Sequence, residues 1–182
     1  GAATEIVVLR FLVTNGVESA PQVIAELSEI EEIVINGAPA SGSGTSAGDG
    51  AGGIVGLTGN GTAARKNSLA GCSNSGKISG ATNVGGIAGK LGNYSIVSAC
   101  ENTGTGDVTG TGNAVGGIAG AAGLGNAANP LSYGSCSNSG KISGVSNVGG
   151  IVGQTGNYNT FGSYDAATKV TSEKNTNTGD VT

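Results

Sequence analysis

Residues 71–94 read GCSNSGKISGATNVGGIAGKLGNY, and residues 135–158 read SCSNSGKISGVSNVGGIVGQTGNY. The two stretches are identical at 18 of 24 positions when they are aligned with an offset of 64 residues. A glycine-rich segment that recurs in this way is typical of stacked repeats and not of a disordered Gly/Ser-rich chain. The sequence therefore predicts a repeat protein.

Two motifs alternate along the chain and define a repeat of about 32 residues. The first, GGI[AV]G, recurs at spacings of 33, 31 and 33 residues and begins at Gly52, Gly85, Gly116 and Gly149. The second has copies that begin at Cys72, Cys100, Cys136 and Asn175. The last copy stops at Thr182 without a GGI motif, so we expect the array to continue and other domains of the same polypeptide to be its neighbours.

The second motif alternates like a half-buried strand. The inward set would be Cys72, Asn74, Gly76 and Ile78, and the outward set Ser73, Ser75, Lys77 and Ser79. The second copy carries two extra residues between Asn102 and Val108. Two residues preserve the parity of a strand, so Val108 is still expected to point inward.

A coil of this length with short strands and glycine turns predicts an all-β fold, a right-handed parallel β-helix (β-solenoid) of about four coils. Like side chains would lie over one another in successive coils. The GGI glycines would turn corners, because glycine admits positive φ and close backbone approach. Four asparagines would form a buried hydrogen-bonded ladder: Asn74, Asn102, Asn138 and Asn177.

The amino-terminal part has a different character and is expected to cap the solenoid. Residues 4–16 are β-rich, and a helix is expected from Ser19, which precedes Pro21 in the first turn. A further strand is expected from residue 32. The predicted organisation is a strand–helix–strand cap over 1–37, a loop over 38–50 and solenoid repeats over 51–182, with a separate small domain or linker as the alternative for the cap.

Composition and charge exclude several function classes. The net charge is −4, and the chain has no basic stripe with interleaved aromatic residues, which argues against nucleic-acid binding. No stretch approaches 18 apolar residues, so no membrane insertion is expected. There is no His to serve as the base for a Ser or Cys nucleophile, so we predict no catalytic residues and no enzyme activity.

The three cysteines occupy equivalent repeat positions. Stacked strands would bring Cys72 and Cys100 close together, but their Cβ vectors would run parallel and the number is odd. Buried free thiols are the favoured prediction, and disulfide pairing is the alternative. Zinc is not expected without further ligands, and GTGDVTGTGN only once approximates a calcium β-roll, so no metal and no cofactor are predicted.

The motifs NVGGIAGKLGNY and AVGGIAGAAGLGN, which recur with C-x-N-[ST]-G-x-[IV]-[ST], resemble the GLUG-motif repeats of large bacterial secreted and surface proteins. These include adhesin-like proteins and some IgA-specific metallopeptidases. The resemblance covers residues 50–182. It implies an extracellular, surface or secreted location and an adhesive or scaffolding role, without an active site in the repeats.

The leading functional prediction is an adhesin-like module that binds a host glycan or an extracellular matrix protein through many weak contacts. A passive stalk and a carbohydrate-active β-helix enzyme are the alternatives. The enzyme would need two carboxylates that converge in one groove. The ligand-binding residues predicted from the sequence are Ser73, Ser75, Lys77, Tyr94, Ser137, Ser139, Lys141 and Tyr158.

Overall fold

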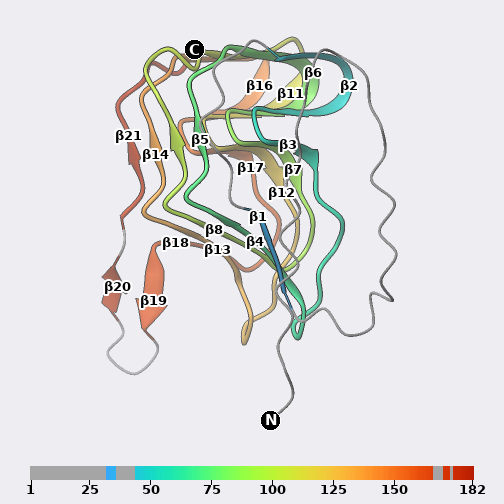
Figure 1. Cartoon of the computed structure of the whole chain (residues 1–182), viewed down its shortest axis with the longest axis vertical. Coiled ribbons are helices and arrows are strands. Elements are labelled where there is room, and N and C mark those ends of the chain that lie inside the picture. Colours follow the sequence, from blue (N-terminus) through green and yellow to red (C-terminus); the bar gives the residue numbers. More distant parts are fainter. Residues whose placement is uncertain (1–31, 36–43, 166–169, 173) are drawn as a thin grey trace.

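The computed structural model describes residues 32–35, 44–165, 170–172 and 174–182. These residues form a stack of parallel β-coils and contain no helix (Figure 1). The all-β parallel solenoid expected from the sequence is therefore confirmed. The strand and helix predicted within residues 4–31 lie outside the described residues.

Each coil passes through four parallel sheets, which we number in the order in which a coil enters them. The first sheet holds β1 (Glu32–Ile35), β4 (Lys66–Ala70), β8 (Ser95–Ser98), β13 (Leu131–Gly134) and β18 (Asn159–Phe161). The second holds β5 (Ser73–Asn74), β9 (Glu101–Asn102), β14 (Ser137–Asn138) and β21 (Thr176–Asn177). The third holds β2 (Gly44–Gly52), β6 (Ile78–Gly85), β10 (Val108–Gly110), β11 (Asn113–Gly116), β15 (Ile142–Ser143) and β16 (Ser146–Gly149). The fourth holds β3 (Val55–Leu57), β7 (Ala88–Leu91), β12 (Ala119–Ala122) and β17 (Val152–Gln154).

Three complete coils follow one another along the stack. Strands β4 to β7 form the first coil, β8 to β12 the second and β13 to β17 the third, while β1 to β3 precede them and β18 and β21 follow them. An antiparallel hairpin of β19 (Ser163–Asp165) and β20 (Val170–Ser172) is inserted between β18 and β21. This hairpin projects sideways from the stack (Figure 1).

The register of the third sheet places like residues beside one another. Val108 is paired with Ile78 on one side and with Ile142 on the other, and all three side chains are buried. The two extra residues of the second coil are taken up between Asn102 and Gly106, because Asn102 bonds the Gly106 carbonyl as Asn74 bonds that of Gly76. The expected inward position of Val108 is confirmed.

Strand β2 departs from the sequence-based expectation. A loop was predicted over residues 38–50, but β2 covers Gly44–Gly52 and pairs in parallel with β6. The segment GTSAGDGAG has no apolar alternation of its own, so only its pairing with the next coil defines it as a strand. Strand β1 begins at Glu32 and pairs with β4, as expected for the segment that leads into the coils.

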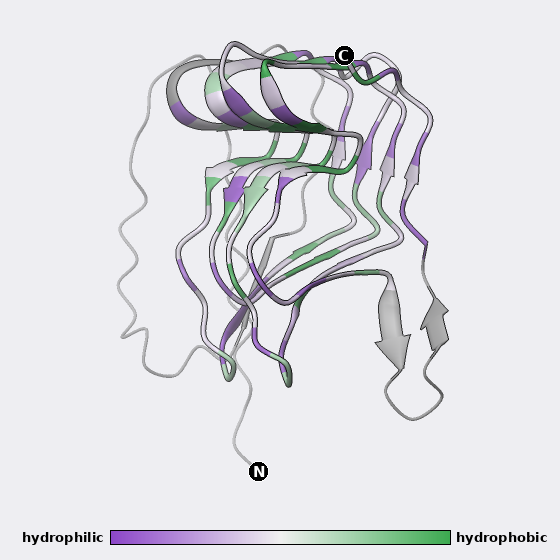
Figure 2. Cartoon of the chain, turned by 180° about the vertical axis from the view of Figure 1, so that it is seen from behind, coloured by the Kyte–Doolittle hydropathy of each residue, from purple (hydrophilic) through white to green (hydrophobic). Residues whose placement is uncertain are grey.

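The core is made of small and medium side chains stacked coil on coil. One cluster combines the isoleucines of the GGI corners, Ile87 and Ile118, with Leu69, Val97 and Leu131 of the first sheet. A smaller cluster lies along the third sheet and includes Ile78, Val84, Val108, Val115 and Ile142. The apolar stretches of successive coils lie over one another in Figure 2. Few large side chains are needed because each coil buries its neighbour.

The predicted asparagine ladder is present in the second sheet. The Nδ2 atom of Asn74 donates to Oδ1 of Asn102 at 2.7 Å, Asn102 donates to Asn138 at 2.7 Å, and Asn138 donates to Asn177 at 2.6 Å. Each amide also donates to a glycine carbonyl in its own coil, as Asn74 does to Gly76 at 2.8 Å. The first three side chains are buried, so these bonds replace the water that they lose.

The second glycine of each GGI motif packs against this ladder. A Cβ atom on Gly86 would lie 2.5 Å from Cγ of Asn102 and 2.2 Å from the Gly117 carbonyl oxygen. The equivalent glycines Gly53, Gly117 and Gly150 face Asn74, Asn138 and Asn177 in the same way. The two motifs recur together because the amide of one occupies the space left by the missing side chain of the other.

The GGI corners depend on close approach and not on positive φ. None of their glycines has a positive φ among the described residues, so the part of the sequence-based expectation that invoked φ is wrong. Left-handed backbone occurs instead at three other repeat positions. The first holds Gly50, Asn83, Ala114 and Asn147, the second holds Gly71, Ala99 and Ser135, and the third holds Tyr94 and Tyr158.

The cysteines form a buried column of free thiols, as predicted. The hydrogen bond with the Cys136 thiol, together with burial, raises the pKa of Cys100 to about 12. Its Sγ atom also lies 3.4 Å from the Ser98 carbonyl oxygen. The Cys100 thiol is therefore protonated at neutral pH, and the same hydrogen bond lowers the pKa of Cys136. All three side chains fill the core as small groups.

Candidate functional site

The predicted serines and lysines lie together on the outer side of the second and third sheets. We call this surface the Ser/Lys face, and it holds Ser73, Ser75, Lys77, Ser137, Ser139 and Lys141. All six side chains are exposed or half-buried, in agreement with their predicted outward direction. The structure thus brings these six residues together on one surface.

Charge on the Ser/Lys face is balanced between coils. The Nζ atom of Lys77 lies 3.3 Å from Oδ2 of Asp107 in the next coil, and Asp107 also accepts a hydrogen bond from the backbone N–H of Lys141 at 3.2 Å. An exposed ion pair of this kind contributes little to stability. The expected pairing of Lys and Asp between coils is confirmed for Lys77 and Asp107.

The two predicted tyrosines lie elsewhere on the coil. Tyr94 and Tyr158 follow strands of the fourth sheet, at the corner that leads back to the first sheet. Tyr94 is half-buried, and its hydroxyl accepts a hydrogen bond from Nδ2 of Asn126 at 3.3 Å, whereas Tyr158 is 58% exposed. They belong to the first and third coils, so the structure joins them neither to each other nor to the Ser/Lys face.

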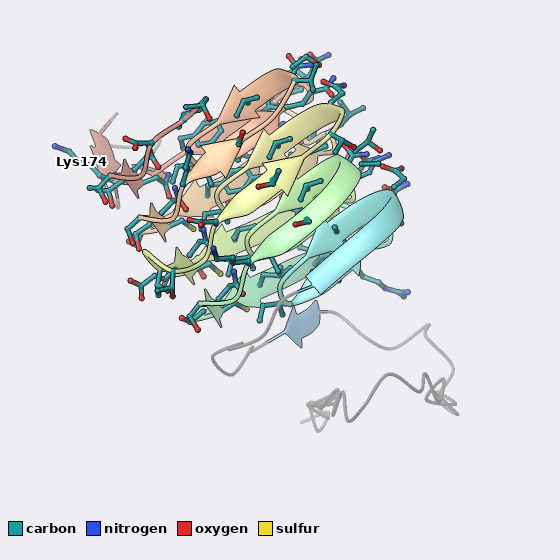
Figure 3. The ribbon with its side chains drawn as sticks, turned by 90° about the horizontal axis from the view of Figure 1, so that it is seen from above. Lys174 is labelled. Carbon is teal, nitrogen blue, oxygen red and sulfur yellow. The ribbon has the colours of Figure 1, made fainter. Side chains whose placement is uncertain are left out.

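A groove of about 450 Å³ runs across the coils on the outer side of the third and fourth sheets. We call it the amide groove. The wall from the third sheet holds Asp49, Thr82, Asn83 and Asn113, and the wall from the fourth holds Lys90, Ala121, Ala122, Gln154, Thr155 and Gly156. The strands of the third sheet lie side by side in Figure 3, so one wall contains side chains from successive coils. The labelled Lys174 projects away from the stack in the same view.

The carboxylate of Asp49 marks one end of the amide groove. It accepts hydrogen bonds from the Thr82 hydroxyl at 3.0 Å and from the amide of Asn83. These bonds, with that from Asn83 the stronger, lower the pKa of Asp49, and the positive charge of Lys90 acts in the same direction. The Asp49 carboxylate is therefore charged at neutral pH and already has two donors.

A network of amides forms the other end of the groove. Oδ1 of Asn113 accepts from Nδ2 of Asn147 at 2.6 Å and from the Ser146 hydroxyl at 3.2 Å. The Nδ2 atom of Asn113 in turn donates to Oε1 of Gln154 at 3.4 Å, which links the third sheet to the fourth. Gln154 uses its acceptor oxygen in this bond, and its amide N–H groups donate to no other described residue, so they are available to a ligand.

The centre of the groove is hollow because the second coil carries alanines there. Ala121 is in register with Lys90 of the first coil and with Gln154 of the third, so a methyl group lies between two long polar side chains. Adjacent strands lie about 4.8 Å apart, so the Cα atoms of Lys90 and Gln154, which are two strands apart, are separated by roughly 10 Å. The groove therefore has an apolar floor and polar ends.

This arrangement is suited to binding. The described groove residues include a single carboxylate, Asp49, whereas the enzyme alternative requires two that converge. In the described part of the chain, no three His, Cys, Asp or Glu side chains are grouped as metal ligands. The described residues also contain no helix that is long and apolar enough to cross a membrane.

Reasoning from the sequence did not identify the groove. Its central column is formed by the residue that follows each GGI[AV]G motif. In successive coils these residues are Leu57, Lys90, Ala121 and Gln154. The signal available was the variation at this one position beside an unvarying motif. Its partner wall was harder to find, because Asn83 and Asn147 recur two residues before GGI but the motif alone does not indicate that their backbone is left-handed.

Comparison with protein families, with curated proteins and with solved structures finds no match for this chain. The resemblance to GLUG-motif repeats thus stays a prediction that rests on the quoted motifs.

Proposed function

We propose that the chain is a carbohydrate-binding repeat module of an extracellular, adhesin-like protein, and that the amide groove is its ligand site. The observation that carries the proposal is the groove itself, with alanine methyl groups between amide, hydroxyl and ammonium groups on successive coils. A sugar ring presents the complementary surface, since its C–H face is apolar and its rim carries hydroxyl groups. Side-chain amides can donate to and accept from such hydroxyls at once.

Stacking favours a ligand that extends along the groove. Lys90, Ala121 and Gln154 lie in three consecutive coils, so a glycan chain can contact several of them together. Each contact is weak, and affinity grows when many are made by one polymer or by many modules on one surface. A host glycan is the leading partner, and an extracellular matrix protein that carries such glycans is the second.

The Ser/Lys face and Tyr158 are proposed as accessory contact surfaces. The face is exposed or half-buried, and none of its six residues lines the amide groove. Tyr158 is exposed and follows the groove residue Gly156 by two positions, so its ring can extend the groove at that end. Extracellular placement rests on the resemblance to GLUG-motif repeats.

A passive stalk is the second candidate function, and the asparagine ladder favours it. The ladder passes without a break through four coils and is packed against a glycine of each preceding coil. A continuous hydrogen-bonded column gives a stiff rod, which is what a spacer between domains needs.

The test is a screen of the purified chain on an array of oligosaccharides and matrix proteins, with affinities then measured by calorimetry. The groove variant is Ala121→Gln, which places in the second coil the side chain that the third coil already carries at this position, and so fills the hollow without disturbing the strand. The matched control is Lys141→Gln on the Ser/Lys face. We expect Ala121→Gln to lose binding, and Lys141→Gln, which removes one accessory contact outside the groove, to weaken it only slightly.

Each other outcome rejects part of the proposal. Loss of binding in Lys141→Gln alone would move the site to the Ser/Lys face. Absence of binding by the folded parent chain to every glycan and matrix protein on the array would leave the stalk as the better account.

A further inference from the structure

We infer that the amide groove selects a sugar that carries a carboxylate, and that Lys90 is the residue that reads this charge. The inference rests on the proposed function and adds the chemical class of the ligand. It covers both a uronate inside a polymer and an acidic sugar at the end of an oligosaccharide, because both present a carboxylate beside a hydroxylated ring.

Lys90 is the cation of the groove, and its ammonium group is not engaged by the protein. Among the described residues it makes no ion pair within 4.0 Å and no side-chain hydrogen bond, whereas Lys77 on the Ser/Lys face is paired with Asp107. The side chain is exposed, so the three donors of the ammonium group are open to a ligand.

Asp49, the anion of the groove, does not take up this role. Its carboxylate is held by Thr82 and Asn83, which already donate to it. The positive charge of Lys90 also lowers the pKa of Asp49, but it is the smallest of the causes, after the hydrogen bonds from Asn83 and Thr82. A ligand carboxylate can therefore bind at Lys90 without displacing a bond within the protein.

The position of Lys90 relative to the hollow fixes the orientation of the sugar. Ala121 is its direct neighbour in the second coil, and Gln154 follows in the third. A ring that lies over the Ala121 methyl group can direct a carboxylate to Lys90 and hydroxyl groups to the free amide N–H groups of Gln154. A neutral sugar would make the same ring and amide contacts but would leave the ammonium group without a partner.

The experiment compares probes that differ only in the carboxylate. Oligogalacturonate is measured against its methyl ester, and sialyllactose against the methyl ester of its sialic acid carboxylate, by calorimetry on the whole chain at low and at moderate salt. We expect each acidic probe to bind about tenfold or more tightly than its neutral match, with an advantage that shrinks as salt is added. Tighter binding of oligogalacturonate assigns an internal uronate as the ligand, and tighter binding of sialyllactose assigns a terminal acidic sugar.

Two variants assign the effect to Lys90. Lys90→Gln, which again resembles Gln154 of the third coil, should remove the preference, so that the variant binds the acidic probe no more tightly than its neutral match. Lys90→Arg should keep the preference. Circular dichroism of each variant checks that the fold is intact.

Failure of this inference is distinct from failure of the proposed function. Equal binding of acidic and neutral probes would overturn the selection of a carboxylate and leave a neutral-glycan site. A preference that persists in Lys90→Gln would overturn the role of Lys90. Absence of binding to any of the four probes and to the whole array would overturn the glycan-binding function and this inference with it.

Discussion

Removal of one rung of the asparagine ladder should destabilise the solenoid more than any other single truncation of similar size. Asn102→Ala deletes three hydrogen bonds, those with Asn74 and Asn138 at 2.7 Å and with the Gly106 carbonyl at 2.6 Å. The groups left behind are buried and cannot bond to water. At about 1–2 kcal/mol for each lost bond with its unsatisfied partner, we expect a loss of about 3–6 kcal/mol.

The assay is urea unfolding followed by far-ultraviolet circular dichroism. With a slope of about 2 kcal/mol per molar urea, the midpoint should fall by roughly 1.5–3 M. The matched control is Asn177→Ala, which removes one ladder bond and the bond to the Gly179 carbonyl. Asn177 is exposed, so water can replace these bonds, and the variant should cost about 1 kcal/mol or less. Equal midpoints for Asn102→Ala and Asn177→Ala would refute the argument that burial makes the ladder important.

Three further perturbations test other parts of the fold. Gly86→Val should lower the free energy of unfolding by at least about 3 kcal/mol, because its Cβ would lie 2.2 Å from a backbone oxygen. Gly59→Val should change the urea midpoint little, because the space around its Cβ is open. Similar midpoints for the two variants would contradict the argument that the GGI corner needs close backbone approach. Ala99→Gly should stabilise the chain by up to about 1 kcal/mol, because Ala99 has a φ of 49° where the preceding coil has Gly71, and a lower melting temperature would contradict this. The thiol of Cys100, with its pKa raised to about 12 from an ordinary value of 9.0, contributes stability that is present below pH 9 and is lost as the pH rises toward 12. The urea midpoint of the parent chain should therefore fall across that range more than that of Cys100→Ala, and equal falls would show that the thiol does not titrate in this way.

The buried side of the repeat could be predicted because it follows a simple rule. Alternation fixed Asn74 and Ile78 as inward and Lys77 as outward, and the fixed spacing of the motifs placed each of them over its copy in the next coil. Parity alone placed Val108 correctly despite the inserted residues. Successive side chains of a strand point to opposite faces, so the number of residues between two positions decides whether they share a face, without information on tertiary contacts.

The amide groove could not be predicted because no local pattern encodes it. It depends on how the GGI corner orients the fourth sheet against the third, and on left-handed residues as different as Gly50, Asn83 and Ala114. The sequence predicts a loop in place of strand β2, which supplies Asp49 to the groove, for a related reason: the conformation of β2 comes from its pairing with β6. Both features arise from contacts between coils.

The column formed by Leu57, Lys90, Ala121 and Gln154 has an evolutionary consequence. One residue in each coil supplies the side chain of this column that faces the groove. The ladder asparagines and the GGI glycines, which stabilise the coil, occupy other repeat positions. A point mutation in this column can therefore change what the surface recognises without a cost to folding. Duplication of the 64-residue unit would lengthen the surface by two steps and copy their chemistry, so the same genetic event extends the rod and multiplies its ligand contacts.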